Sequence, residues 1–275
     1  MGLQHNKWMK KTMFKARLLT SLVLVPLVLG LIFYANMWVL GAIILLLVVL
    51  GGWEWLQLVP VQKPLNKGLF IAALLFLVYV CFYSLTFWLV AGLVLWAFIL
   101  LAVVAYPKSE KWWGYPCVVG GACLLLLPLF ANTLAGIYQH EQGSGYILYV
   151  LCLVWAADIG AYLAGKACGR HKLIPLVSPG KTLEGSFGGV LGVIGVATIG
   201  FFYFKPGMMG YWYALAIGTG LISMLGDLFI SMLKRRSKLK DTGRIFPGHG
   251  GLLDRLDSLI AAAPFFYCGL SCLGH

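Results

Sequence analysis

Long apolar stretches separated by short polar connections run along the whole chain. A membrane-spanning helix needs roughly 20 mostly apolar residues, and nine segments meet this need: 17–35, 37–55, 68–86, 88–106, 115–138, 145–165, 187–204, 209–233 and 256–274. Their apolar residues are consecutive, whereas the strands of a membrane barrel alternate polar and apolar positions. Since only helices and closed barrels satisfy the backbone in lipid, the pattern predicts an all-α polytopic membrane protein with about nine spans. The connection near 84–86 is very short, so the exact boundary between the third and fourth spans stays open.

The composition agrees with a chain whose main solvent is lipid. Hydrophobic residues make up 61% of the chain and charged residues 11%, and the mean hydropathy is +0.89. About a quarter of an ordinary soluble domain is charged. The N-terminus resembles a signal peptide, but its apolar run has full spanning length and another span follows, so an uncleaved first helix is predicted. The seven cysteines form no CxxC pair, and no metal or redox role is expected of them.

Basic residues are confined almost entirely to one side of the predicted membrane. Of the 21 lysines and arginines, all except Lys205 lie at the N-terminus or in connections that follow even-numbered spans. The positive-inside rule therefore predicts a cytoplasmic N-terminus, an external C-terminus, and cytoplasmic connections at 166–186 and 234–256. The net charge of +12 reflects this topology and attraction to anionic lipid. No nucleic-acid partner is expected, because the charges flank spans and do not line one soluble face.

The acidic residues divide the chain into two parts. All five aspartates lie after residue 150, so the region 1–140, with about five spans, is predicted to be a scaffold or an oligomer contact, and 141–275 the catalytic region. Glu54, which stands between two tryptophans at a span end, is predicted to anchor its helix at the membrane interface. No internal repeat is visible, which disfavours a transporter built from duplicated halves.

Two aspartates lie inside predicted spans. Asp158 and Asp227 each lie about six or seven residues before the cytoplasmic end of a span, roughly 10 Å below the surface at a rise of 1.5 Å per residue. Because a charged side chain in the membrane costs free energy, their matching depth predicts one shared polar cavity. A pair of structural hydrogen bonds between helices is the alternative. Four polar residues share the helix face of Asp227 and predict a water-accessible wall: Thr219, Ser223, Ser231 and Lys234.

The connection at 234–256 holds the densest chemistry of the chain. Its basic residues are followed by Gly250 and Gly251, whose backbone N–H groups can approach an anion closely. Asp254 and Asp257 share a face of the next helix, at an N-terminus where a capping role is the alternative. Carboxylates beside a basic glycine loop suit Mg²⁺ that holds a polyphosphate, so Asp227 and Asp254 are predicted metal ligands, and a second cation stays open.

His249 lies in the same loop, and a basic segment lies on the same membrane side. For His249 a general base, a phosphate donor and a turn residue are all open, and the donor or positioning role is favoured because a phosphate nucleophile needs no base. Gly180-Lys181-Thr182 resembles the end of a Walker A loop, but proline stands at 175, where the first glycine is required. Four residues of the segment are predicted to bind phosphate by charge and polarity: Arg170, Lys172, Ser178 and Lys181.

The stretch 231–257 resembles the signature of the phosphatidate cytidylyltransferases, the CDP-diacylglycerol synthases. Every position of that pattern is matched: Ser231, Lys234, Arg235, Lys240, Asp241, Gly243, Phe246, Pro247, His249, Gly250, Gly251, Leu252, Asp254, Arg255 and Asp257. The segments around Asp158 and at 178–182 are also similar to the family. The resemblance covers about 155–258, and the earlier spans match only in hydropathy.

This resemblance implies that CTP and phosphatidate react to give CDP-diacylglycerol and pyrophosphate, with Mg²⁺. It also implies an inner-membrane enzyme of phospholipid synthesis, active at the cytoplasmic face among membrane lipids, and a homodimer. Lys181, Arg170 and Lys172 would contact the triphosphate, and Lys234 and Arg235 the lipid head group. Two alternatives are a related cytidylyltransferase that acts on another lipid phosphate, and a cation-coupled transporter, which would not explain the dense loop.

Overall fold

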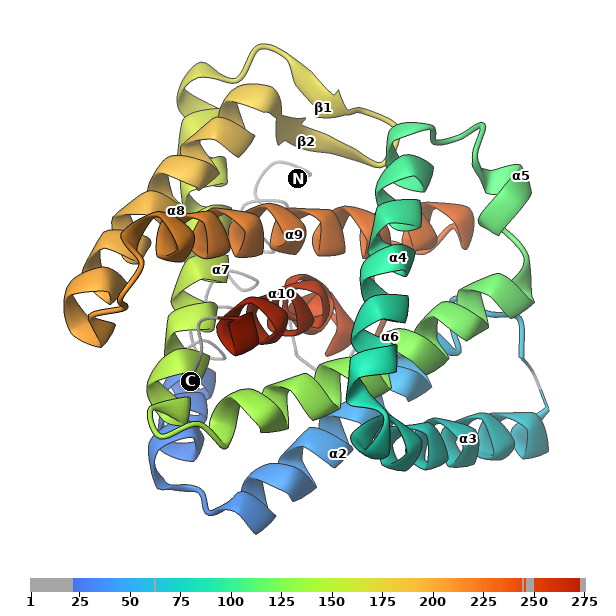
Figure 1. Ribbon diagram of the computed structural model, residues 1–275. Helices are drawn as coiled ribbons and strands as arrows, with labels where there is room; N and C mark the ends of the chain where they lie inside the picture. Colours follow the sequence, from blue (N-terminus) through green and yellow to red (C-terminus); the bar gives the residue numbers. More distant parts are fainter. Residues whose placement is uncertain (1–21, 62, 244, 246–249, 273–275) are drawn as a thin grey trace, which may run out of the picture.

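The protein is a bundle of long apolar helices. The computed structural model describes residues 22–61, 63–243, 245 and 250–272 (Figure 1). A short helix at Leu22–Tyr34 comes first. It is followed by these elements: α2 (Met37–Trp55), α3 (Pro64–Tyr83), α4 (Leu85–Val104), α5 (Glu110–Trp113), α6 (Pro116–Tyr138), α7 (Gly143–Cys168), β1 (Lys172–Ile174), β2 (Ser178–Thr182), α8 (Leu183–Phe204), α9 (Met209–Arg236) and α10 (Leu253–Cys272).

Seven of the described helices are long and apolar enough to cross a membrane, namely α2, α3, α4, α6, α7, α8 and α9. They coincide with the second to eighth predicted spans, so the prediction of an all-α polytopic membrane protein is confirmed. Ser84 separates α3 from α4, which settles the division left open at that junction. The first predicted span begins outside the described residues, and α10, which holds the ninth, carries Asp254 and Asp257 in its first turns. The total of nine spans stays a prediction.

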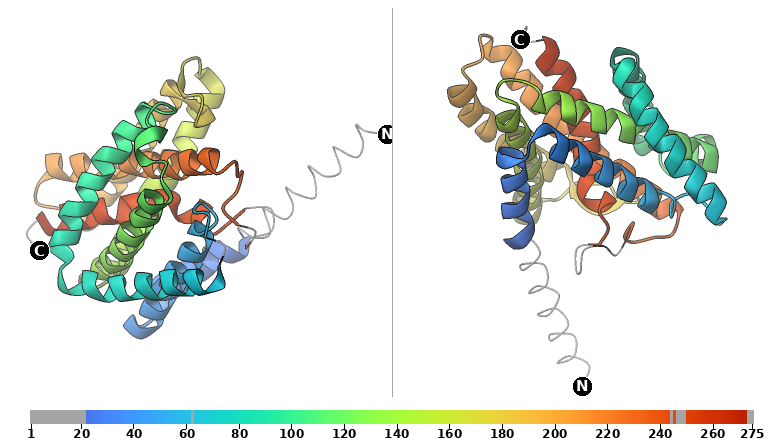
Figure 2. Two further views of the ribbon diagram at one scale, coloured as in Figure 1. Left: turned by 90° about the vertical axis from the view of Figure 1, so that its right-hand side faces the viewer. Right: turned by 90° about the horizontal axis from the view of Figure 1, so that it is seen from below.

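α9 and α10 lie at the centre of the bundle. α10 packs against α2, α4, α6, α7 and α9, and α9 also contacts α8 (Figure 1). The two views of Figure 2 show the same arrangement, with α7 and α8 along one flank and α3 and α4 along another. α9, which carries Asp227, and α10, which carries Asp254 and Asp257, are therefore enclosed by the rest of the molecule.

α7 and α8 pack with their backbones in close contact because glycines face each other. A Cβ atom at Gly160 would meet the backbone of Gly188, and one at Gly189 would meet the carbonyl of Ala157 at 2.7 Å. Small residues let membrane helices approach in this way. The close packing fixes the connection between the two helices, which carries the predicted phosphate-binding residues.

That connection contains a hairpin that the sequence did not predict. β1 and β2 pair antiparallel, with Lys172 opposite Thr182, and they lie above α9 in Figure 1. The threonine then caps α8, because its side-chain oxygen accepts the backbone N–H of Gly185 at 3.0 Å. The predicted loop 166–186 is thus the end of α7, a hairpin and the first turn of α8.

The orientation of the bundle in the membrane is a testable prediction. With 166–186 and 234–256 in the cytoplasm and the C-terminus outside, a periplasmic phosphatase fused after His275 should be active. A cytoplasmic reporter fused at the same point should be inactive. The reverse pair of activities would contradict the orientation derived from the basic residues.

Candidate active site

Three aspartates from three helices lie close together. Asp158 of α7, Asp227 of α9 and Asp257 of α10 interact electrostatically, and the carboxyl groups of Asp227 and Asp257 are hydrogen-bonded to each other. The side chain of Asp158 is exposed and that of Asp227 is 31% exposed, so the group is open to one side. The structure therefore brings together the two intramembrane aspartates that were predicted to share a site, and it adds Asp257.

Lys181 joins the hairpin to this group. Its Nζ lies 2.7 Å from Oδ2 of Asp227, and both side chains are about a quarter to a third exposed, at 25% and 31%. Nζ also lies 3.4 Å from the carbonyl oxygen of Met224. A lysine predicted to bind phosphate thus neutralises a carboxylate that was predicted to bind metal.

Lys234 and Asp254 form a second, more buried pair. Nζ of Lys234 lies 2.7 Å from Oδ1 of Asp254, and the two side chains are only 14% and 7% exposed. Oδ2 of Asp254 accepts the backbone N–H groups of Thr242 at 2.8 Å and Gly251 at 3.0 Å. One carboxylate therefore holds the end of α9 and two parts of the glycine-rich loop against the start of α10.

Glu54 is a functional-region residue that the sequence interpretation missed. It is only 1% exposed, and its carboxylate accepts the backbone N–H groups of Leu252 at 2.9 Å and Leu253 at 2.7 Å and the hydroxyl of Thr242 at 3.2 Å. The prediction of an interfacial anchor is therefore wrong. Because a carboxylate is favoured at a helix N-terminus, Glu54 of α2 stabilises the first turn of α10 from outside that helix.

Two glycines of the loop are required by this packing. A Cβ atom at Gly251 would lie 2.6 Å from the Thr242 hydroxyl and would clash with Glu54, and one at Gly243 would also clash with Glu54. Gly250 has a φ of +85°, in the region that favours glycine. The N–H of Gly251 is used by Asp254, so the phosphate-binding role predicted for Gly250 and Gly251 stays a prediction.

The polar stripe on α9 is only partly water-accessible. Thr219 and Ser223 are fully buried, and their hydroxyls donate to the carbonyl oxygens of Leu215 at 2.7 Å and Gly220 at 2.7 Å. The prediction of a water-accessible wall is wrong for these two positions, because helical spacing shows a shared face but not what covers it. Ser231, one turn after Asp227, does lie in the site and donates to its Oδ1 at 3.4 Å.

The remaining predicted residues lie around this centre. Arg235 is exposed, and its Nε donates to the carbonyl oxygen of Val177 at 3.2 Å. The side chains of Arg170 and Lys172 are exposed and that of Ser178 is half-buried; within the described part of the chain, no hydrogen bond or ion pair joins these three to the aspartates. Glu184 fixes the start of the hairpin by accepting the backbone N–H of Arg170 at 3.1 Å. His249 lies outside the described residues.

The carboxylates fit a magnesium ion only in company with a substrate. Within the described residues, no group of three or more histidine, cysteine, aspartate or glutamate side chains is arranged to hold a metal ion. Mg²⁺ needs fewer protein ligands than this, because one or two carboxylates suffice when substrate phosphates and water complete its coordination shell. Asp227 and Asp254 each have an ammonium group 2.7 Å away, where a cation would be expected. The assignment of these two residues to Mg²⁺ stays a prediction.

Known proteins match the chain over most of its length. A model of the cytidylyltransferase family matches residues 15–273. A phosphatidate cytidylyltransferase of Haemophilus influenzae is 36% identical over 280 residues, which covers 92% of this chain and 97% of that protein. One of Pseudomonas aeruginosa is 38% identical over 262 residues, with 92% and 96% covered. One of Staphylococcus aureus is 36% identical over 176 residues, with 63% and 66% covered.

Proposed function

Because the chain belongs to the cytidylyltransferase family, as the stretch 231–257 predicted, we propose that it makes CDP-diacylglycerol from CTP and phosphatidate. It is a nucleotidyltransferase and a multi-pass membrane protein. The observation that carries the proposal is the pair of lysine–carboxylate contacts, Lys181 with Asp227 and Lys234 with Asp254, at the junction of the hairpin and the glycine-rich loop. Two cations and two anions held in this way suit a site for polyphosphate.

The reaction joins two highly charged anions. An oxygen of the phosphatidate phosphate attacks the α-phosphorus of CTP, the bond from that phosphorus to the bridging oxygen breaks, and pyrophosphate leaves. The attacking oxygen already carries negative charge, so no general base is needed. Positioning and neutralisation of charge supply most of the catalysis in phosphoryl transfer.

Lys181 and Lys234 have one role before the substrate binds and another afterwards. Without substrate, each neutralises a carboxylate that would otherwise repel a triphosphate. With substrate, the ammonium groups would contact phosphate oxygens, and Asp227 and Asp254 would hold Mg²⁺. A bound Mg²⁺ would neutralise charge on the triphosphate and on the departing pyrophosphate.

The neighbours of these pairs have supporting roles. Asp257 would help to hold Asp227 in place through their hydrogen bond, and Asp158 would add negative charge that favours a bound cation. Arg235, exposed at the end of α9, would receive the lipid phosphate. We place the enzyme in the bacterial inner membrane as a homodimer with its site at the cytoplasmic face, on the basis of the family resemblance and the basic connections.

An assay of the purified protein with labelled CTP and several lipid phosphates, with and without Mg²⁺, tests the proposal. We expect CDP-diacylglycerol and pyrophosphate in equal amounts from phosphatidate, only with the metal present. A higher kcat/KM with an isoprenoid phosphate than with phosphatidate would favour the related enzyme instead. Absence of any lipid product would refute the proposed function.

Lys181→Ala is expected to weaken CTP binding more than phosphatidate binding. A charge-assisted contact to phosphate is commonly worth about 1.5–3 kcal/mol, so the KM for CTP should rise roughly ten- to a hundredfold. Steady-state kinetics with each substrate varied in turn would measure the split. Lys63→Ala removes an exposed lysine at the start of α3 and serves as the control. Unchanged kinetics for CTP would remove Lys181 from the site.

A further inference from the structure

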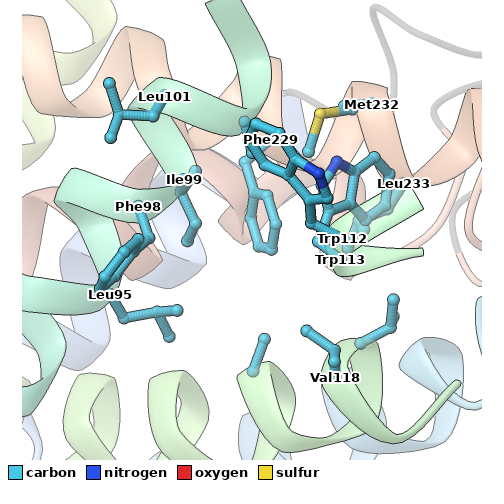
Figure 3. A pocket seen from close by; sticks show the side chains of 13 residues that line it. Leu95, Phe98, Ile99, Leu101, Trp112, Trp113, Val118, Phe229, Met232 and Leu233 are labelled. Carbon is cyan, nitrogen blue, oxygen red and sulfur yellow. The ribbon is translucent and has the colours of Figure 1, made fainter. Parts of the chain in front are cut away.

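An apolar pocket opens between α4, α5, α6 and α9 (Figure 3). Its volume is about 400 Å³, which falls within the range of small-molecule sites, about 300–1,000 Å³. We call it the α4–α9 pocket, and its walls include Phe98, Ala102, Trp113, Val118, Phe229 and Leu233. The catalytic aspartates are not among its lining residues, so it is a separate feature of the molecule.

The pocket has a closed inner wall and an open rim. Phe229 and Leu233 of α9 are 4% and 1% exposed, whereas Phe98 of α4 and Trp112 of α5 are 64% and 73% exposed. α4, α6 and α9 are candidate membrane spans, so an apolar rim at this place suits contact with lipid. The lining comes from the end of α4, the start of α6 and the end of α9, which all lie at the predicted cytoplasmic side.

A cationic group lies close in sequence to the α9 residues that line this pocket. Arg235 follows Leu233 by two residues, and Glu110 and Arg235 both interact electrostatically with Tyr106, whose ring lies 6.4 Å from that of Trp113. Within the described part of the chain, no carboxylate forms an ion pair with Arg235, in contrast to Lys181 and Lys234. The guanidinium is exposed and therefore accessible to an anion.

Arg235 also connects the pocket to the active site around α9. Residues three and four apart lie on neighbouring positions of a helix surface. Arg235 is three residues from Met232, which lines the pocket, and four from Ser231, which donates to Asp227. A phosphate at Arg235 would therefore lie between the apolar pocket and the aspartates.

We propose that the α4–α9 pocket receives one acyl chain of the phosphatidate substrate while the phosphate of that lipid lies at Arg235. The inference rests on the proposed function. A lipid phosphate is favoured over a second copy of this chain because Arg235, two residues beyond the lining residue Leu233, forms no ion pair with a carboxylate among the described residues. A cation in this position complements an anionic head group above an acyl chain.

Filling the pocket should discriminate between substrates by chain length. Ala102→Phe places a ring in the pocket, and Ala73→Phe places the same ring on an exposed position of α3 as the control. Because the ring takes the place of part of the acyl chain and removes its van der Waals contacts with the pocket wall, the KM for dioleoyl phosphatidate should rise severalfold. The KM for dihexanoyl phosphatidate and for CTP should change less than about twofold. Equal effects on both lipids, or none on either, would overturn the proposal.

Photolabelling of the wild-type protein gives a test that needs no variant and no turnover. A phosphatidate with a diazirine in its acyl chain should label peptides that contain Phe98, Trp113 or Phe229. Excess phosphatidate should compete with this labelling, and Ala102→Phe should reduce it. Equal competition by phosphatidylcholine, or labelling elsewhere alone, would refute the pocket as a substrate site. Failure to turn over phosphatidate would refute the proposed function instead, and the labelling result would still decide the pocket.

Discussion

Asp227→Asn and Asp254→Asn are each expected to lower turnover roughly a hundred- to a thousandfold, the size of losing one group that stabilises charge in a transition state. Each replacement keeps the shape of the side chain and removes a negative charge beside a lysine. If both carboxylates hold Mg²⁺, the loss should persist at saturating metal. Because the two would act as a unit, the double variant should be little worse than either single one.

The measurement is CDP-diacylglycerol formation by purified variants over a range of Mg²⁺ concentrations, with melting temperature in detergent recorded alongside. Asp227→Asn should keep its melting temperature, since that side chain is 31% exposed. Asp254→Asn should lower the melting temperature. The carboxylate of Asp254 is only 7% exposed and accepts two backbone N–H groups, and the amide can replace it only in part. Glu141→Gln, at an exposed position, is the control. Substantial product from either well-expressed single variant would show that the metal is held elsewhere.

Glu54→Ala is expected to cost both stability and turnover. It leaves the N–H groups of Leu252 and Leu253 and the hydroxyl of Thr242 without their partner in a buried position. Each unpaired buried polar group costs about 1–3 kcal/mol. We therefore expect a melting temperature several degrees lower, at about 2–4 °C per kcal/mol. Turnover should fall at least about tenfold, a loss worth 1.4 kcal/mol, because Asp254 directly follows Leu253.

Glu54→Gln separates charge from shape. The amide keeps one oxygen that accepts a hydrogen bond but turns an NH₂ group toward the other donors, so its effects should be smaller than those of alanine and in the same direction. Glu110→Ala, which removes a carboxylate from the short helix α5, is the comparison. Glu54→Ala protein with the wild-type melting temperature and turnover would show that the loop holds its shape without this residue.

Features set by local pattern were predicted correctly from the sequence. The spans α2 to α4 and α6 to α9 follow from continuous apolar runs. The family was identified from a motif whose residues lie within one short segment. The pairing of Lys181 with Asp227 was not predicted, because charge alone indicates which residues share a membrane face but not which of them meet. Lys181 and Lys234 were both predicted to contact the substrate, whereas in the structure each contacts a carboxylate.

The misses have physical reasons of the same kind. Glu54 lies between two tryptophans, which is typical of an interfacial residue, but its partners are 188 to 199 positions away in the sequence. No local periodicity records such a contact. The hairpin of β1 and β2 is equally hidden, since a strand of three residues and one that contains Pro179 show no alternation of polar and apolar positions.

The large sequence separation between Glu54 and its partners also has a consequence for the order of folding during synthesis. Its carboxylate emerges from the ribosome nearly two hundred residues before the backbone groups of Leu252 and Leu253 that it will bind. An uncompensated charge in lipid is costly, so the nascent chain must keep Glu54 in contact with water while α3 to α9 are inserted. Only the arrival of α10 allows that carboxylate to become buried. We therefore expect completion of the candidate active site to be a late step in folding, coupled to the docking of the last described helix.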